Sequence, residues 1–168
     1  MDHQNMIRIF EYALNQEETG KSFFETSLQR MGLGAATTAF KRIIEEEQRH
    51  IRFINAVLGD LKSEKALHVG DLKSIALEPT NYFDDRSRSE FLEQCINESM
   101  VPDVTVFNTA WLIEKDLSEF YENMAEKASG EPAEALNMLA NWEKAHERFF
   151  REFRDQLTET YAKMPWGG

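Results

Sequence analysis

The sequence predicts an all-α protein, a four-helix bundle made of two helical hairpins, and three observations support this. Apolar residues recur at helical spacing over four long stretches. No segment shows strand-like alternation of useful length. The two halves of the chain resemble each other at an offset of about 97 residues. A chain of 168 residues can bury a sizeable core, so we expect one domain over residues 1–168.

The first predicted hairpin spans about residues 2–61. Its two helices are separated near Gly32, because glycine commonly ends a helix. The apolar stripe of the second helix contains Phe40, Ile43, Glu47, His50, Ile54, Val57 and Leu61. Glu47 and His50 therefore lie about one turn apart on a face that should be buried. A buried carboxylate is costly unless something compensates its charge, so this stripe predicts a partner for Glu47.

A long connection, about residues 62–102, leads to the second hairpin. Neighbouring helices of an up-down bundle need loops of only about 2–8 residues. We therefore expect a crossover along the length of the bundle, which makes the second and third helices parallel. The crossover should contain a short amphipathic helix near residues 90–98. The second hairpin, about 103–162, should consist of helices over about 104–128 and 133–161.

The repeat brings a set of acids and bases into register. The matched residues are Glu17, Glu47 and His50 in the first half, and Glu114, Glu143 and His146 in the second. Each half thus carries one Glu followed by a Glu-x-x-His pair. In each hairpin, the midpoint between the two Glu residues falls at the predicted turn. The two therefore lie at the same height on adjacent helices, about 20 Å from the turn.

These six side chains predict a site for two divalent metal ions. Four carboxylates in an apolar core would repel one another and take up protons, whereas two divalent cations would neutralise them. Carboxylate and imidazole ligands without thiolate suit iron or manganese, with zinc as a substitute. Each metal would take one terminal Glu and one His, while Glu47 and Glu143 bridge and leave positions open for O2 or peroxide. The alternative is a set of partly exposed charges beside a plain helical core.

Several other residues have chemistry that the site does not require. Tyr121 lies two turns after Glu114 on the same stripe. It can hydrogen-bond a ligand or pass an electron, or simply pack in the core like its counterpart Phe24. We expect Glu45 and Glu46, on other helix faces, to be solvated. The single cysteine, Cys95, is expected to be a small buried hydrophobe, and His3 and His68 to be surface residues. Packing or interface roles are expected for Trp111, Trp142 and Trp166.

The net charge of −11 disfavours nucleic acid and anionic membrane as partners, because both would be repelled. The first ten residues contain no apolar run resembling a signal peptide, and no stretch approaches the 18 apolar residues of a membrane span. We therefore expect a cytoplasmic protein with no nucleic-acid or membrane partner. One cysteine cannot form an internal disulfide or a thiolate metal cluster.

Over nearly its whole length the chain resembles the ferritin-like di-iron carboxylate proteins, and among them the rubrerythrin-like group. The segments that carry the resemblance are Glu17-Glu18-Thr19-Gly20 with Phe23-Phe24, Glu47-Gln48-Arg49-His50, Glu114-Lys115-Asp116-Leu117 with Phe120-Tyr121, and Glu143-Lys144-Ala145-His146. The resemblance implies a ferritin-like bundle, an oxo- or carboxylate-bridged centre of two iron ions, and redox chemistry with O2 or H2O2. It is also the sole basis for expecting a homodimer.

The chain departs from that group in two ways. Rubrerythrins proper have a rubredoxin-like domain with four cysteines that delivers electrons, whereas this chain has one cysteine, so we expect an external electron donor. They also carry an extra carboxylate at the position of Leu117, where it takes part in redox-linked iron movement. Our first hypothesis is a di-iron oxidoreductase of the rubrerythrin-like, peroxidase-like kind. A ferroxidase for iron storage or detoxification is the alternative, and a non-catalytic, metal-stabilised bundle is a third.

Overall fold

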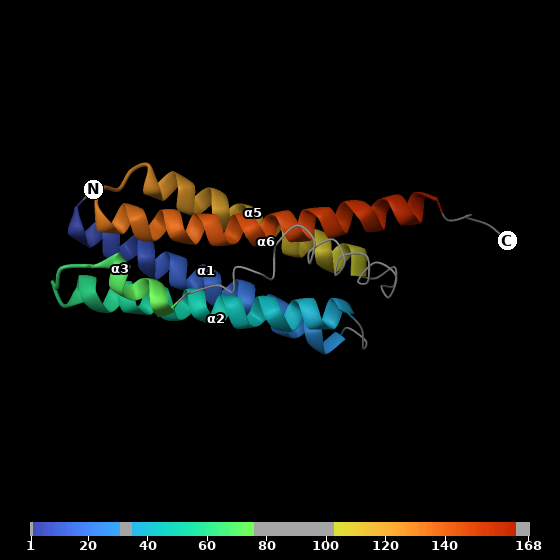
Figure 1. Ribbon diagram of the computed structural model, residues 1–168, viewed down its shortest axis with the longest axis horizontal. Coiled ribbons are helices and arrows are strands. Elements are labelled where there is room, and N and C mark those ends of the chain that lie inside the picture. The colour runs from blue at the N-terminus through green and yellow to red at the C-terminus, as the bar shows by residue number, and fades with distance from the viewer. Residues whose placement is uncertain (1, 31–34, 76–102, 164–168) are drawn as a thin grey trace.

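A computed structural model describes residues 2–30, 35–75 and 103–163, and these residues form an all-α bundle without strands (Figure 1). The long helices are α1 (His3–Arg30), α2 (Ala35–Lys62), α5 (Asp103–Ala125) and α6 (Glu131–Ala162). Helix α1 packs antiparallel to α2, and α5 packs antiparallel to α6, so the predicted pair of hairpins is confirmed. None of the helices in these ranges combines the length and apolar content that a bilayer crossing would require.

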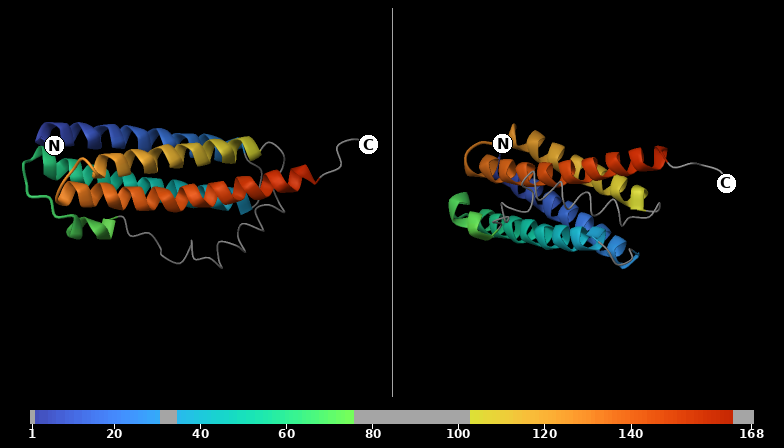
Figure 2. Two further views of the ribbon diagram at one scale, coloured as in Figure 1. Left: turned by 90° about the horizontal axis from the view of Figure 1, so that it is seen from above. Right: turned by 45° about the vertical axis from the view of Figure 1, so that its right-hand side comes forward.

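The two hairpins are joined as the long connection predicted. Helices α2 and α5 run in the same direction, and α2 ends at the opposite end of the bundle from where α5 begins (Figures 1 and 2). The connection contains a short helix, α3 (Val69–Leu72), followed by the 3-10 turn η1 (Lys73–Ile75). The amphipathic piece expected near residues 90–98, including Cys95, lies outside the described residues.

The turn of the second hairpin shifts two helix ends from their predicted positions. Helix α5 ends at Ala125, three residues earlier than expected, and α6 begins at Glu131, two residues earlier. Gly130 between them has φ +64°, a left-handed conformation that glycine adopts without a steric penalty. Its carbonyl accepts a hydrogen bond from the Glu134 N–H. Pro132 then lies in the first turn of α6, where its missing N–H costs no helical hydrogen bond.

Two apolar clusters form the core, and a layer of buried charged residues separates them on all four long helices. One cluster includes Phe10, Ala13, Phe53, Ile54, Val57, Leu117, Tyr121, Leu136 and Leu139. The other is rich in phenylalanine and includes Phe24, Phe40, Phe107, Phe149, Phe150 and Phe153. Burying one such ring contributes about 1.5–3 kcal/mol. The apolar packing on both sides therefore fixes the height at which the charged residues meet.

Candidate metal centre

All six side chains that the repeat singled out lie in the charged layer. Glu17 comes from α1, Glu114 from α5, and the two Glu-x-x-His pairs from α2 and α6. Each of the six has an exposed fraction of 0%. The apolar stripes that predicted these positions are therefore core stripes, and partly exposed charges beside a plain core are ruled out.

His50 has three carboxylates around one ring nitrogen. Its Nδ1 lies 2.7 Å from Glu143 Oε1, 3.6 Å from Glu17 Oε2 and 3.7 Å from Glu47 Oε2. The neighbours thus include the Glu of its own pair and a Glu from each of two other helices. We call Glu17 and His50 the first half-site.

His146 repeats this arrangement from the other hairpin. Its Nδ1 lies 3.1 Å from Glu47 Oε1, 3.3 Å from Glu143 Oε2 and 3.6 Å from Glu114 Oε2. Glu114 and His146 form the second half-site. Glu47 and Glu143 each direct one oxygen at His50 and the other at His146, so both carboxylates are shared between the half-sites.

The donor atoms converge as metal ligands do. One ligand atom from each of Glu47, His50, Glu143 and His146 can be chosen so that all lie within 4.8 Å of one another. Seven buried carboxylate oxygens, on Glu17, Glu47, Glu114 and Glu143, accept no hydrogen bond from the part of the chain that the structure describes. Such groups are costly to bury unless a cation compensates them. The residues therefore fit two divalent cations, which would balance the four negative charges.

Without a metal, protons provide the compensation. Burial, together with repulsion from Glu143 and Glu47, raises the pKa of Glu17 and of Glu114 well above the ordinary value. Burial also acts to raise the pKa of Glu143, but the two imidazoles outweigh it and hold that pKa well below the ordinary value. Burial acts to lower the pKa of both histidines, yet the surrounding carboxylates raise it well above 6.5. The metal-free centre therefore binds protons that a metal must displace.

Residues around the centre hold the two half-sites differently. The Tyr121 hydroxyl donates a short hydrogen bond to Glu17 Oε1. Burial and the Glu17 charge raise the pKa of Tyr121 well above 10.0, so the phenol keeps its proton. The Trp142 ring stacks on His50, with ring centroids 5.1 Å apart and an interplanar angle of 11°. Tyr121 therefore contacts the site, although it also packs in the core.

The expectation that Glu46 is solvated is wrong. Its exposed fraction is 1%, and its Oε2 lies 2.7 Å from His146 Nε2 across the bundle. Arg42 supplies a second contact, with Nε 3.3 Å from Glu46 Oε1. A carboxylate on the second nitrogen of a ligating histidine fixes its tautomer and orientation. Glu45, by contrast, is exposed as expected.

One signal for Glu46 was available in the sequence. At the offset of 96 residues that matches the Glu-x-x-His pairs, Glu46 corresponds to Trp142. An indole at the matching position indicates a face that is at least half-buried, as Trp142 is. The stripe on α2 is therefore wider than the residues that defined it.

The remaining predicted residues lie away from the centre. His3 and His68 are exposed, as expected. Trp111 packs on the surface of α6, with its Nε1 donating to Glu147 Oε1 at 3.2 Å and Arg154 lying 4.0 Å over its ring. Trp166 lies outside the described residues.

Fold and site together define a class of protein, a helical bundle with a cluster of carboxylates and histidines buried between two hairpins. The family model for rubrerythrin matches residues 8–154. The chain belongs to the rubrerythrin family, a ferritin-like family of di-iron proteins. Neither the comparison with curated proteins nor that with solved structures found a match. The family and the buried cluster both indicate a metal site.

Proposed function

We propose that this protein is a non-haem di-iron oxidoreductase that reacts with H2O2 or O2 and receives electrons from an external donor. In this proposal six buried residues would hold the two iron ions, namely the two residues of each half-site and the two shared carboxylates. Glu17 and Glu114 would each serve one ion as terminal ligands, the two imidazoles would bind through Nδ1, and Glu47 and Glu143 would serve both ions as bridges. The proposal also includes a homodimer in the cytoplasm, on the family likeness and the sequence alone.

A single observation carries the assignment of a two-metal site. Glu47 directs Oε1 at His146 and Oε2 at His50, and Glu143 directs Oε1 at His50 and Oε2 at His146. A carboxylate that served one ion would have no reason to divide its oxygens between two imidazoles. Carboxylate and imidazole donors without thiolate match iron or manganese better than softer metals.

When bound, the two ions would supply Lewis acidity and electrons for reduction of the oxidant. The chain's own residues prepare the site for that chemistry. The apolar clusters on both sides of the charged layer keep bulk water away from it. Tyr121 holds one oxygen of Glu17 by a hydrogen bond, and Glu46 orients His146. The second oxygen of Glu17 remains directed at His50, so the carboxylate is held in a binding orientation.

Anaerobic loading with Fe(II), followed by O2 or H2O2, tests the proposal. We expect two Fe(II) per chain, oxidation by either oxidant with a change in the iron spectrum, and re-reduction that depends on an added electron donor. Continuous oxidation of excess Fe(II) with retained mineral would instead identify an iron-storage or detoxification protein. If neither oxidant changes the iron spectrum, the redox function is wrong.

A further inference from the structure

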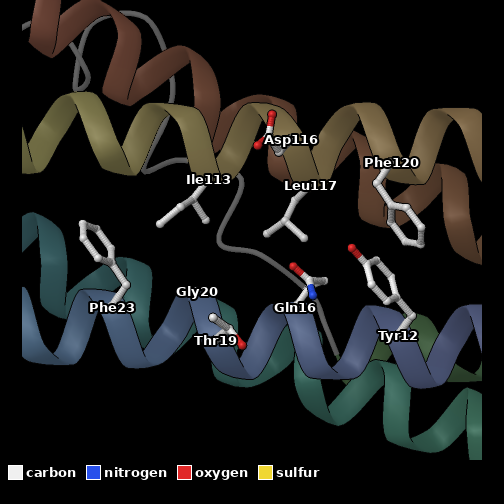
Figure 3. Close-up of a pocket in the computed structure, with 9 residues that line it drawn as sticks. All are labelled: Tyr12, Gln16, Thr19, Gly20, Phe23, Ile113, Asp116, Leu117 and Phe120. Atoms are coloured by element: carbon white, nitrogen blue, oxygen red, sulfur yellow. The ribbon is translucent and has the colours of Figure 1, made fainter.

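A groove lies between α1 and α5, on the side of the bundle that supplies Glu17 and Glu114. It has a volume of about 380 Å³. Side chains from the two helices point toward one another across it (Figure 3). Its lining consists of Tyr12, Gln16, Thr19, Gly20, Phe23, Ile113, Asp116, Leu117 and Phe120. The helices of each hairpin pack closely along their length, whereas α1 and α5 make far fewer contacts, which leaves this space.

The lining of the groove follows the same internal repeat as the two half-sites. Eight of its nine lining residues form pairs at the offset of 97 that also relates Glu17 to Glu114. The pairs are Gln16 with Ile113, Thr19 with Asp116, Gly20 with Leu117, and Phe23 with Phe120. The groove is therefore lined by equivalent positions of the two repeats, the same relation that links Glu17 to Glu114.

The floor of the groove lies one helical turn from the terminal carboxylates along α1 and α5. Gly20 and Leu117 are its most buried lining residues. Gly20 follows Glu17 by three residues and Leu117 follows Glu114 by three, so each lies one turn along the same helix face. The imidazoles come from α2 and α6, on the far side of the centre. The groove is thus the approach to the carboxylate side of the site.

The lining defines what kind of molecule fits. Among the described residues that line it, the polar side chains are Gln16, Thr19, Asp116 and the Tyr12 hydroxyl, and of these Asp116 alone is charged. An anionic occupant would be repelled by the Asp116 carboxylate, so a neutral one is favoured. A volume of about 380 Å³ is in the range of small-molecule sites. Hydrogen peroxide, with two oxygens, would leave most of it empty, since one water takes about 30 Å³.

We propose that this groove binds neutral alkyl hydroperoxides, with the alkyl group against Phe23, Leu117 and Phe120 and the peroxide end toward the floor at Gly20. The inference rests on the proposed redox function and names its substrate class. The reaction is ROOH + 2 e⁻ + 2 H⁺ → ROH + H2O. The O–O bond breaks, the peroxide is reduced to alcohol and water, and the external donor supplies both electrons.

Binding is tested without turnover. The protein is loaded with zinc, which has no redox chemistry, and titrated with 2-phenyl-2-propanol, the alcohol formed from cumene hydroperoxide. We expect saturable binding that shifts the backbone NMR signals of Gly20, Phe23, Leu117 and Phe120. Absence of saturable binding, or shifts elsewhere only, would overturn the proposal.

Variants at Gly20 fill the groove from its floor. A Cβ at this position would meet only Ile113 Cγ2 at 3.5 Å, an ordinary contact, so Gly20→Ala should fold normally. Gly20→Leu should weaken binding of the alcohol by about tenfold or more, because one extra methylene in an apolar pocket already changes affinity by about 10–200-fold. Gly20→Ala should weaken it less. Equal affinity of both variants and the wild type would contradict a site at the groove.

Gly59 provides a matched control. It is also a glycine within a long helix, and a Cβ there would meet nothing within 4 Å. Alanine is a better helix former than glycine, so Gly20→Ala and Gly59→Ala should both raise Tm by about 2–4 °C. Only the Gly20 variants should weaken binding of the alcohol. This separates an effect on the groove from an effect on stability.

A kinetic comparison separates this inference from the proposed function. Fe(II)-loaded protein is mixed with H2O2 or with cumene hydroperoxide. Faster oxidation by the alkyl hydroperoxide, with a preference that falls in Gly20→Leu, supports the inference. Oxidation by H2O2 without that preference overturns the inference and leaves the proposed function intact. No reaction with either peroxide, or with O2, overturns both.

A second copy of the chain is an alternative occupant of the groove. NMR signals of the groove residues that shift on dilution of the protein would show that a second copy covers the groove, which also overturns the inference.

Discussion

The two half-sites have the same ligand types but different supporting residues. Each offers one terminal Glu, one His and access to the two shared carboxylates. In the first, Tyr121 donates to the terminal Glu17 and Trp142 stacks on the imidazole. In the second, the position that matches Tyr121 is occupied by Phe24, which has no hydroxyl, and Glu46 contacts the imidazole instead.

The two halves of the repeat therefore keep the same candidate ligands, whereas the residues that orient these ligands differ between the halves. Each supporting residue comes from the opposite hairpin to the ligand that it contacts: Tyr121 reaches Glu17, and Glu46 reaches His146. The two half-sites therefore offer unlike environments, with a neutral hydrogen-bond donor beside Glu17 in one and an additional carboxylate beside His146 in the other. Substitutions can remove the shared part of the site or either support separately.

Loss of a shared carboxylate should have the largest effect, because it affects both half-sites. Glu47→Ala or Glu143→Ala should lower the metal content from two ions per chain to fewer than one, whereas Glu17→Ala should spare the second half-site. Metal analysis after loading with Fe(II) or Zn(II) measures this. Glu45→Ala, at the exposed neighbour of Glu47, is the control. Two ions retained in Glu47→Ala would show that this residue does not bridge.

Without metals, the folded chain should lose stability as pH rises, and the metal-loaded protein should lose less. The carboxylates raise the pKa of His50 and His146 well above 6.5 in the folded metal-free chain. Their stabilising contribution is complete below about pH 6.5 and is lost as pH rises through the raised values. The pKa values of Glu17 and Glu114 are also raised, so their contribution to stability likewise falls as pH rises above about 4.5. The stabilising effect of the lowered pKa of Glu143 is lost only as pH falls below about 4.5.

The Tm of metal-free protein should therefore fall as pH rises above about 6.5, and that of metal-loaded protein should fall less. Metal uptake should release protons, which an indicator dye can record. If the Tm of both forms changed with pH in the same way, or if metal uptake released no protons, the metal-free centre would not hold the protons inferred for it.

Glu46→Gln should weaken the second half-site alone. The amide keeps the volume of the side chain but removes the charge that holds His146, and such changes typically cost about 10–100-fold in metal affinity. Competition with a chelator should resolve one weakened site and one unchanged site. The counterpart change, Trp142→Phe, keeps a ring near His50 and should cost less. Equal weakening of both sites in Glu46→Gln would show that the half-sites are not independent.

Tyr121→Phe should have the smallest effect and should make the half-sites more alike. It removes one hydrogen bond to Glu17, which is worth about 1 kcal/mol, or about fivefold in affinity for the first ion. The chelator titration used for Glu46→Gln measures it. The reciprocal change, Phe24→Tyr, tests whether a hydroxyl at the matching position can support Glu114. A loss in Tyr121→Phe that falls on the second half-site would contradict the observed pairing.

Much of the site was predictable because the six buried residues, the candidate ligands, occupy positions that helical periodicity defines. The stripes placed Glu17 and Glu47 on buried faces, and the repeat gave Glu114 and Glu143 independently. The prediction failed for Glu46, which lies at the edge of the α2 stripe and whose contact with His146 joins residues 100 positions apart. The role of Tyr121 was left open for a related reason, since its contact with Glu17 joins residues 104 positions apart. The early start of α6 follows the left-handed backbone of Gly130, whose carbonyl accepts the Glu134 N–H.

By itself the sequence determined four amphipathic helices, their pairing into hairpins and the six candidate ligands, because spacing along one helix decides which residues share a face. Only the tertiary structure decided which oxygen of each shared carboxylate faces which imidazole, how Tyr121 and Glu46 make the half-sites unlike, and where α1 and α5 leave a groove. These features depend on distances between helices, which packing of the whole core sets and no local pattern records.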